Sequence, residues 1–311
     1  MTGSERPWQG ARRLAIANLK GGVGKSTTAM MIADSLSLAH RARVLVIDVD
    51  PQANVSRMLL GAKGLKQAHQ ASSTLGDWVG AATRGQPLSL AQMVRPQVSS
   101  LTEIVRERTA HRPRPHGDVS VLPATPELRF AEIAFDHASY SAADPASARL
   151  RMERLLTAAL APLSDAFELI LFDCPPGFST LAQAAVATAD AIISPVLEEP
   201  LSVWSLQAFR DFGLQKTLNA WEPARHRGLY TRVNQKGAVD ERREVREAVR
   251  QLGFQMLTTS IKEAAEAQRW VRRAGPDAHA PFNKKYGPVR NQVQELGREV
   301  ASFIANLPPK P

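Results

Sequence analysis

The stretch Arg13–Thr27 (RLAIANLKGGVGKST) decides the fold. Its first six residues, Arg13–Asn18, are predicted to form a short buried strand, and Lys25–Ala39 has the apolar spacing of a helix. Between them, the glycines of Lys20–Thr27 let the backbone curl so that successive N–H groups point inward. A strand, a glycine-rich loop and a helix in this order predict a phosphate-binding loop at a helix N-terminus.

Individual residues of this loop have predicted roles. We expect Lys25 to contact the β- and γ-phosphates of ATP and the Ser26 hydroxyl to bind Mg²⁺. The usual pattern has glycine five residues before Gly24, where this chain has Leu19, and the loop carries an additional lysine at Lys20. The residues predicted to surround the nucleotide are Lys20, Gly21, Gly22, Val23, Gly24, Lys25, Ser26 and Thr27.

Further apolar runs alternate with helical patterns along the chain, and the clearest are Arg43–Asp48, Phe167–Asp173, Ala191–Val196 and Gly228–Val233. Strands that are apolar on both faces, separated by helices, are typical of a parallel sheet that is covered on both sides. The sequence therefore predicts an α/β fold with a doubly wound, mostly parallel sheet and helices on both faces. We expect a single domain over 1–311, with a flexible N-terminus at 1–13, a surface insertion at 98–118 and a disordered tail at 307–311.

Three aspartates follow the predicted strands. Asp48 and Asp50 come at the end of one strand and Asp173 at the end of another. Ligands of open α/β sheets bind beyond the carboxyl ends of the strands, so these side chains are expected beside the phosphates. We predict that Asp48 and Asp173 help to hold Mg²⁺, Asp173 through a water molecule, and that Asp50 orients the attacking water.

Composition excludes several classes of protein. The chain has 311 residues, of which 44% are hydrophobic and 22% charged, so it is neither wholly disordered nor fibrous. Its single cysteine, Cys174, rules out an intramolecular disulfide and fits a cytoplasmic protein. No uninterrupted apolar run approaches the roughly 18 residues of a membrane span, so no spanning helix is expected. The last predicted helix has the apolar spacing of a helix packed on the core and not of a membrane anchor, so no membrane partner is expected.

Charge is concentrated near the C-terminus. The formal net charge is +9, and residues 221–311 carry 17 basic and 10 acidic side chains, a net charge of +7. This asymmetry indicates a polyanionic partner, either nucleic acid or an anionic membrane, or a basic surface that only keeps the protein in solution.

The motifs together resemble the ParA/MinD family of deviant Walker A ATPases. KGGVGKST, VLVIDVDPQANVS and FELILFDCPPGFS are similar to its three nucleotide-site motifs, and the resemblance extends from about Leu14 to Phe303. Within this family STLGDWV, VSVLPATPEL and VNQKGAVDERREV resemble the ParA partition branch.

The resemblance implies a weak ATPase that forms ADP and phosphate. It implies a homodimer that encloses two ATP molecules, in which Lys20 reaches the nucleotide of the other subunit and Asn234 contacts adenine. It also implies a cytoplasmic, nucleoid-associated protein whose hydrolysis is stimulated by a ParB-like protein or another cargo adaptor.

The resemblance further implies non-specific binding of the dimer to double-stranded DNA. Asp240–Leu252 is a predicted helix on which Arg243, Arg246 and Arg250 form one stripe. The other candidate contacts are Lys262, Arg269, Arg272 and Arg273. Such contacts would be to DNA phosphates and carry no sequence information. Any single arginine could instead belong to an ordinary solvated helix face.

Two alternatives stay open at this point. The cargo could be a plasmid or chromosome, or a protein assembly such as a chemotaxis cluster or carboxysome. The chain could also be a metabolic ATP-dependent ligase or amidase of the same fold, such as dethiobiotin synthetase or a cobyrinate amidase. Lys20 and the Asp50-Pro51-Gln52 sequence argue against the metabolic alternative.

Overall fold

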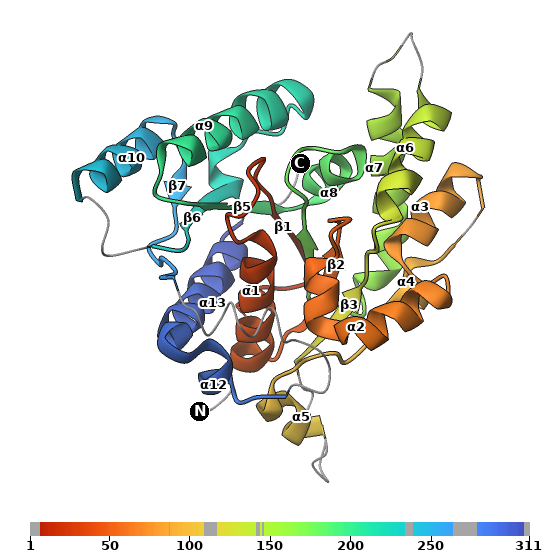
Figure 1. The fold of residues 1–311 in the computed structure, drawn as a ribbon, viewed down its shortest axis with the longest axis horizontal. Coiled ribbons are helices and arrows are strands. Elements are labelled where there is room, and N and C mark those ends of the chain that lie inside the picture. The colour runs from red at the N-terminus through yellow and green to blue at the C-terminus, as the bar shows by residue number, and fades with distance from the viewer. Residues whose placement is uncertain are drawn as a thin grey trace.

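One parallel sheet organises the protein. The structure is a computed structural model that describes residues 7–86, 88–108, 117–140, 144, 146–233, 239–263 and 279–307. Within these ranges the strands pair in the order β3-β2-β4-β1-β5-β6-β7, all parallel (Figure 1). Their bounds are β1 Arg12–Ile16, β2 Arg43–Asp48, β3 Asp118–Leu122, β4 Leu169–Asp173, β5 Ala191–Val196, β6 His226–Tyr230 and β7 Gln255–Met256. This arrangement confirms the predicted doubly wound α/β class.

Helices cover both faces of the sheet (Figure 1). On one face lie α1 Lys25–His40, α2 Asn54–Gln70, α12 Phe282–Tyr286 and α13 Arg290–Ala305. On the other lie α3 Leu75–Thr83, α4 Leu90–Met93, α6 Leu128–Ser139, α7 Ser147–Leu160 and α8 Thr180–Thr188. A short helix, α5 Thr102–Arg108, also packs on the first face. Two further helices, α9 Pro200–Ala208 and α10 Val239–Gln251, lie near β6. A π-helical segment, Phe209–Thr217, continues α9.

The two faces of the strands explain the uninterrupted apolar runs. In β4 all five residues are buried. Leu169 and Leu171 belong to the core on the side of α1, whereas Ile170 and Phe172 belong to the core on the side of α7. A strand that alternates between two cores cannot expose a polar face, which is why its sequence reads as continuously apolar.

Three boundaries differ from the sequence-based expectations. Trp8 is buried and donates a hydrogen bond from Nε1 to the Glu168 carbonyl oxygen, 3.2 Å away, so the described part of the N-terminal segment is anchored rather than flexible. Within the expected insertion at 98–118, Leu101 and Ile104 are buried in the core, so its first part is not a surface loop. Leu307 is buried too, whereas residues 109–116 and 308–311 lie outside the described ranges.

Candidate functional site

The carboxyl ends of the three central strands converge on one point. Asp48, the last residue of β2, is the register partner of Asp173, the last residue of β4, and Asp173 is also level with Ile16 of β1. The chain leaves β1 at this edge and enters the predicted phosphate loop before α1 begins. Sheet topology therefore brings the loop and the two aspartates together.

Positive backbone φ angles shape the loop. Gly22 has φ 74° and Gly24 has φ 89°, values that L-residues with a side chain rarely adopt. Gly24 precedes α1 directly, and its carbonyl oxygen accepts the first helical hydrogen bond, from Thr28 N at 2.8 Å. Val23 is fully buried, and its carbonyl oxygen accepts a hydrogen bond of 2.8 Å from Thr231 Oγ1 beyond β6. The loop is thus fixed where it enters α1, with a backbone that an anion can approach closely.

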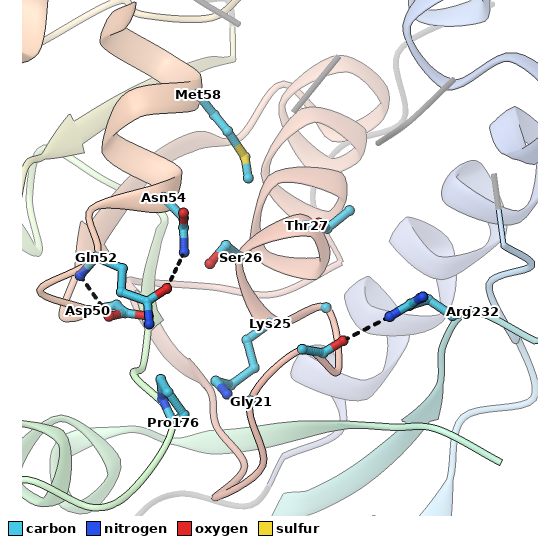
Figure 2. Close-up of a pocket in the computed structure, with 12 residues that line it drawn as sticks. Gly21, Lys25, Ser26, Thr27, Asp50, Gln52, Asn54, Met58, Pro176 and Arg232 are labelled. Atoms are coloured by element: carbon cyan, nitrogen blue, oxygen red, sulfur yellow. Dashed lines mark hydrogen bonds between the residues drawn. The ribbon is translucent and has the colours of Figure 1, made fainter. Parts of the chain in front are cut away.

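A cavity of about 470 Å³ opens over the loop (Figure 2). In Figure 2 the acidic and amide side chains Asp50, Gln52 and Asn54 lie on one side, and Arg232 lies on the opposite side. The complete lining is Gly21, Gly22, Gly24, Lys25, Ser26, Thr27, Asp50, Gln52, Asn54, Met58, Pro176 and Arg232. Volume and lining are suited to a polyphosphate ligand with an apolar portion.

Lys25 lies at the centre of this cavity. Its ammonium donates a 2.7 Å hydrogen bond to the carbonyl oxygen of Lys20, which curves the loop around the side chain. Burial lowers the pKa of Lys25 from its usual value, while the negative charges of Asp173 and Asp50 act in the opposite direction. An anionic ligand would add another favourable charge beside this buried ammonium.

Asp173 carries a buried carboxylate with no ordinary hydrogen-bond partner. Within the described ranges neither oxygen meets the distance and angle of a hydrogen bond, although the Ser26 hydroxyl is a nearby donor, and the side chain is fully buried. Burial raises the pKa of Asp173 well above its usual value, and the charge of Asp48 raises it further, whereas the nearby Ser26 hydroxyl lowers it. A buried, unpaired carboxylate of this kind needs a cation or an ordered water.

The donor set around Asp173 fits Mg²⁺. No three His, Cys, Asp or Glu side chains converge as a metal cluster in the part of the chain that the structure describes. Protein-bound Mg²⁺ commonly takes one or two carboxylates, completes its shell with water and phosphate oxygens, and does not require such a cluster. Ser26 and Asp173 are therefore the residues that would hold the ion.

Asp48 was predicted to help hold Mg²⁺, but in the structure its carboxylate accepts hydrogen bonds from the protein. Its Oδ2 accepts hydrogen bonds from Ser56 N at 2.9 Å and Ser56 Oγ at 2.6 Å, and its Oδ1 accepts one from Asp50 N at 3.1 Å. Burial nevertheless raises the pKa of Asp48 to about 7. Because both oxygens already accept hydrogen bonds, Asp48 shapes the loop that follows β2, and the geometry favours Asp173 over Asp48 as the metal ligand.

Asp50 points into the cavity from this loop. Its Oδ1 accepts a 2.9 Å hydrogen bond from Gln52 N, and Asn54 Nδ2 donates to Gln52 Oε1 at 3.3 Å (Figure 2). Burial raises the pKa of Asp50, whereas the Gln52 N–H and Lys25 lower it. Gln52 and Asn54 were not among the predicted site residues, although they belong to the motif that supplies Asp50.

Lys20 turns its side chain away from its own cavity. Its ammonium forms an ion pair with Glu199, the residue that precedes α9, and its side chain does not line the cavity. Its backbone N–H donates to Asn18 Oδ1 at 3.2 Å. Of the two lysines in the loop, Lys25 therefore lines the cavity, whereas Lys20 pairs with Glu199.

Arg232 is a further cation at the cavity that sequence reasoning missed. Its Nη1 lies 3.4 Å from the carbonyl oxygen of Gly22, and its Nη2 forms a 3.0 Å ion pair with Glu263. The residue precedes Asn234 by two positions, but Asn234 itself lies outside the described residues. The sequence did contain a signal for Arg232: it is a basic residue near the end of a predicted strand, two positions before the predicted adenine contact Asn234.

The predicted DNA-binding arginines have unequal surroundings. Arg243 and Arg250 on α10 have side chains 80% and 76% exposed, and among the described residues each pairs with a neighbour on the same helix. Arg246 instead pairs with buried Glu198 at 2.6 Å and lies over the Tyr230 ring. Lys262 lies on the exposed segment that bridges to Val233, while Arg269, Arg272 and Arg273 are outside the described ranges.

The fold and the loop define an α/β P-loop nucleotide-binding protein. A family model described as an AAA domain, AAA_31, matches residues 11–219, and the chain belongs to this family of ParA/MinD-type ATPases. The match thus covers the phosphate loop and the segments that follow β2 and β4.

Curated relatives agree with this assignment. The chromosome partitioning protein ParA of Myxococcus xanthus is 33% identical over 193 residues, which cover 62% of this chain and 54% of the relative. The chromosome-partitioning ATPase Soj of Thermus thermophilus is 30% identical over 188 residues, covering 60% and 55%. The chain spans about half the length of the curated relatives that it matches.

Solved structures share the fold over most of the chain. A putative plasmid partition protein from Borrelia burgdorferi, solved with AMPPNP, gives a TM-score of 0.63 at 17% identity and covers 93% of this chain and 99% of its own. The cell division ATPase MinD of Pyrococcus furiosus gives 0.61 at 16% identity, with coverage of 94% and 99%. Among the helices described here, none has the length and apolarity needed to cross a membrane.

Proposed function

We propose that this protein is a partition ATPase that binds ATP and Mg²⁺, forms a dimer on ATP and binds DNA without sequence preference. Its cargo is a plasmid or chromosome, and a ParB-like partner stimulates hydrolysis and releases the dimer from DNA. The single observation that carries the proposal is that one loop contains two lysines with different orientations. Lys25 lines the nucleotide cavity, whereas Lys20 does not.

The phosphate loop supports the nucleotide part of this proposal. The N–H groups of Gly21–Thr27 and the N-terminus of α1 would hold the phosphates, with Lys25 between them. Bound Mg²⁺ would neutralise charge that develops on the phosphate oxygens. Ser26 and Asp173 are the protein groups that fit this ion, through the hydroxyl and the unpaired buried carboxylate.

Asp50 is the proposed water-orienting residue. It lines the cavity on the side of Gln52 and Asn54, away from Arg232 (Figure 2). Gln52 N holds Oδ1, and the second carboxylate oxygen, which has no hydrogen bond to another described residue, could accept one from water. Phosphoryl transfer needs an oriented nucleophile and neutralised charge, and this arrangement supplies an acceptor for the water proton.

The second lysine supports dimerisation. A cation that reaches the nucleotide of another subunit acts as an arginine finger does, by neutralising transition-state charge in trans. Lys20 stands outside its own cavity and its side chain is 22% exposed, so it is accessible to a partner once it leaves Glu199. Dimerisation in turn would place two copies of the basic α10 surface on one duplex and increase avidity.

The test measures three properties of the purified protein together. Size-exclusion chromatography with and without ATP and Mg²⁺ reports the dimer, fluorescence anisotropy of a random-sequence duplex reports DNA binding, and phosphate release reports turnover. We expect a dimer and DNA binding only with ATP, and slow turnover. Lys25→Ala is the control that should lose all three properties.

Two outcomes would overturn the proposal. If turnover requires a small carboxylic acid or amine and ignores DNA, the chain is a metabolic enzyme of the same fold. If ATP gives neither a dimer nor DNA affinity, the partition function fails even though the nucleotide site stands. A dimer that binds DNA with ATP, together with stimulation by the product of a neighbouring ParB-like gene, supports it.

A further inference from the structure

The backbone around Arg232 is fixed against the phosphate loop. Arg232 has φ 52°, in the left-handed region that non-glycine residues rarely occupy. On one side Thr231 donates from Oγ1 to the Val23 carbonyl oxygen at 2.8 Å and from N to the Val196 carbonyl oxygen at 2.9 Å. On the other side Val233 pairs with Lys262. This conformation returns the Arg232 side chain across the loop toward Gly22 instead of outward along the strand.

The contacts that the guanidinium makes with other described residues are weak. The 3.4 Å separation from the Gly22 carbonyl oxygen is at the outer limit of a hydrogen bond. The ion pair with Glu263 joins two side chains that are 48% and 42% exposed, and pairs of this kind contribute little stability. A guanidinium has five N–H donors in a planar fork, so these two bonds leave donors for a ligand.

The position of Arg232 identifies which end of a nucleotide it meets. Asp50, Gln52 and Asn54 lie on the side of the cavity where the attacking water belongs, which is the γ-phosphate side (Figure 2). Arg232 faces them from the opposite side of the loop, and Thr27 is the α1 residue drawn nearest to that side (Figure 2). The phosphate chain runs across the loop between the two sides. Arg232 therefore meets the nucleoside end of the chain, where the α-phosphate lies.

We propose that Arg232 is a nucleotide-binding residue whose guanidinium pairs with the α-phosphate of bound ADP or ATP. The pairing replaces the weak contact with Gly22 and competes with Glu263 for the same cation. Arginine suits this task because its planar fork matches phosphate oxygens and keeps its charge at any physiological pH. The inference rests on the nucleotide binding in the proposed function and adds a specific anchor that is common to di- and triphosphates.

The experiment separates charge from hydrogen bonding at this position. Isothermal titration calorimetry with ADP and ATP, in the presence of Mg²⁺, is applied to the wild type and to Arg232→Ala, Arg232→Gln and Arg232→Lys. We expect Ala and Gln to weaken both nucleotides by about tenfold and by the same factor, because the α-phosphate is shared. Lys should stay within about threefold of the wild type. Glu263→Gln should bind as tightly as the wild type or more tightly, because it removes the competing carboxylate.

Contrary results are equally specific. If Gln binds like the wild type while Ala does not, Arg232 only supports the Gly22 carbonyl, and the inference is wrong. A loss confined to ATP would place the guanidinium at the γ-phosphate and also overturn it. If the wild type binds both nucleotides and every Arg232 variant binds equally, this inference alone fails. If the wild type binds neither nucleotide, the proposed function fails first.

Discussion

The ammonium group of Lys20 forms an ion pair with the carboxylate of Glu199 in the same chain. Glu199 is the residue immediately before α9, so the contact joins the phosphate loop to the helix that follows β5 in the chain. The lysine that we propose to act on the nucleotide of another subunit is therefore bound within its own subunit in this conformation. In the proposed dimer, Glu199 would compete with that nucleotide for the Lys20 ammonium.

Glu199→Gln should favour the ATP-bound dimer. The variant removes the competing charge but keeps a polar side chain of similar size before α9. Because the pair is partly exposed, its removal is worth at most ~1 kcal/mol in each of the two subunits, which corresponds to up to about a thirtyfold tighter dimer. Analytical ultracentrifugation with ATP and Mg²⁺ measures this. A weaker dimer would show that Glu199 supports the contact across the interface.

Lys20→Ala should separate nucleotide binding from dimerisation. Lys25 remains in the cavity and keeps ATP in the monomer, while the variant has no cation to offer the second subunit at this position. We expect ATP affinity within a few fold of the wild type and no dimer by size-exclusion chromatography. Lys20→Arg is the matched control, since it keeps the charge. A dimer that persists unchanged in Lys20→Ala would remove this residue from the interface.

Asp50→Ala should bind ATP and dimerise but hydrolyse it at least a hundredfold more slowly, as expected when a group that positions the nucleophile is removed. The reason is the position of its carboxylate in the cavity beside Gln52 and Asn54. Single-turnover phosphate release measures the step, and a nucleotide-binding assay shows that the site is intact. If this variant hydrolyses ATP at the wild-type rate, a group other than Asp50 orients the attacking water.

Asp173→Asn should stabilise the nucleotide-free protein while weakening its use of Mg²⁺. Burial and Asp48 raise the pKa of Asp173, so the folded state binds a proton more strongly than the unfolded state. The free energy of unfolding therefore falls as pH rises above the unfolded pKa of about 4, and Asp48, with its pKa raised to about 7, contributes in the same direction.

Urea unfolding at pH 5 and pH 8 tests this expectation. The variant should lose less stability between these pH values and should be more stable than the wild type at pH 8, by about 1–3 kcal/mol. The Mg²⁺ dependence of ATP affinity, measured on the same samples, should become weaker. Equal pH dependence in the two proteins would show that Asp173 is already solvated or paired in solution.

Charge reversal at Arg243 and Arg250 should reduce DNA affinity without loss of stability. Both side chains are exposed on α10 and lack partners beyond that helix among the described residues. The dependence of log affinity on log salt should flatten by roughly 0.9 for each DNA phosphate that the variant no longer neutralises. Arg246→Ala is the contrasting variant, because Arg246 holds α10 to Glu198 and Tyr230, so its removal should lower the unfolding temperature. Unchanged affinity and slope in the double variant would exclude α10 from the DNA interface.

The sequence predicted those elements correctly whose conformation depends on the residue pattern of the same segment. The runs in β2 and β4 are apolar on both faces, and Gly22 and Gly24 of the phosphate loop have positive φ angles that favour glycine. It missed β3 because this short strand follows an Arg- and Pro-rich stretch that dominated the interpretation of 98–118. The two-residue β7 is too short to leave a periodic pattern.

Residues brought to the site by tertiary contacts could not be predicted in the same way. Arg232 meets Gly22 across 210 positions of sequence, and Glu199 meets Lys20 across 179. Neither residue belongs to a motif with a fixed spacing from the loop. The partners of Asp48 were equally hidden, since nothing local shows that Ser56 turns back to occupy its carboxylate.

The hydrogen bonds between Asp48 and Ser56 close the segment that carries Asp50, Gln52 and Asn54 into a ring. A closed ring has few conformations to lose, so ordering it around a phosphate costs little conformational entropy. Ser56 Oγ also accepts a hydrogen bond from Ala124 N, beyond the end of β3, at 3.0 Å. A displacement of this ring would therefore also move the segment after β3, the outer strand of the sheet, and the start of α2. The motion would not stay within the loop that follows β2.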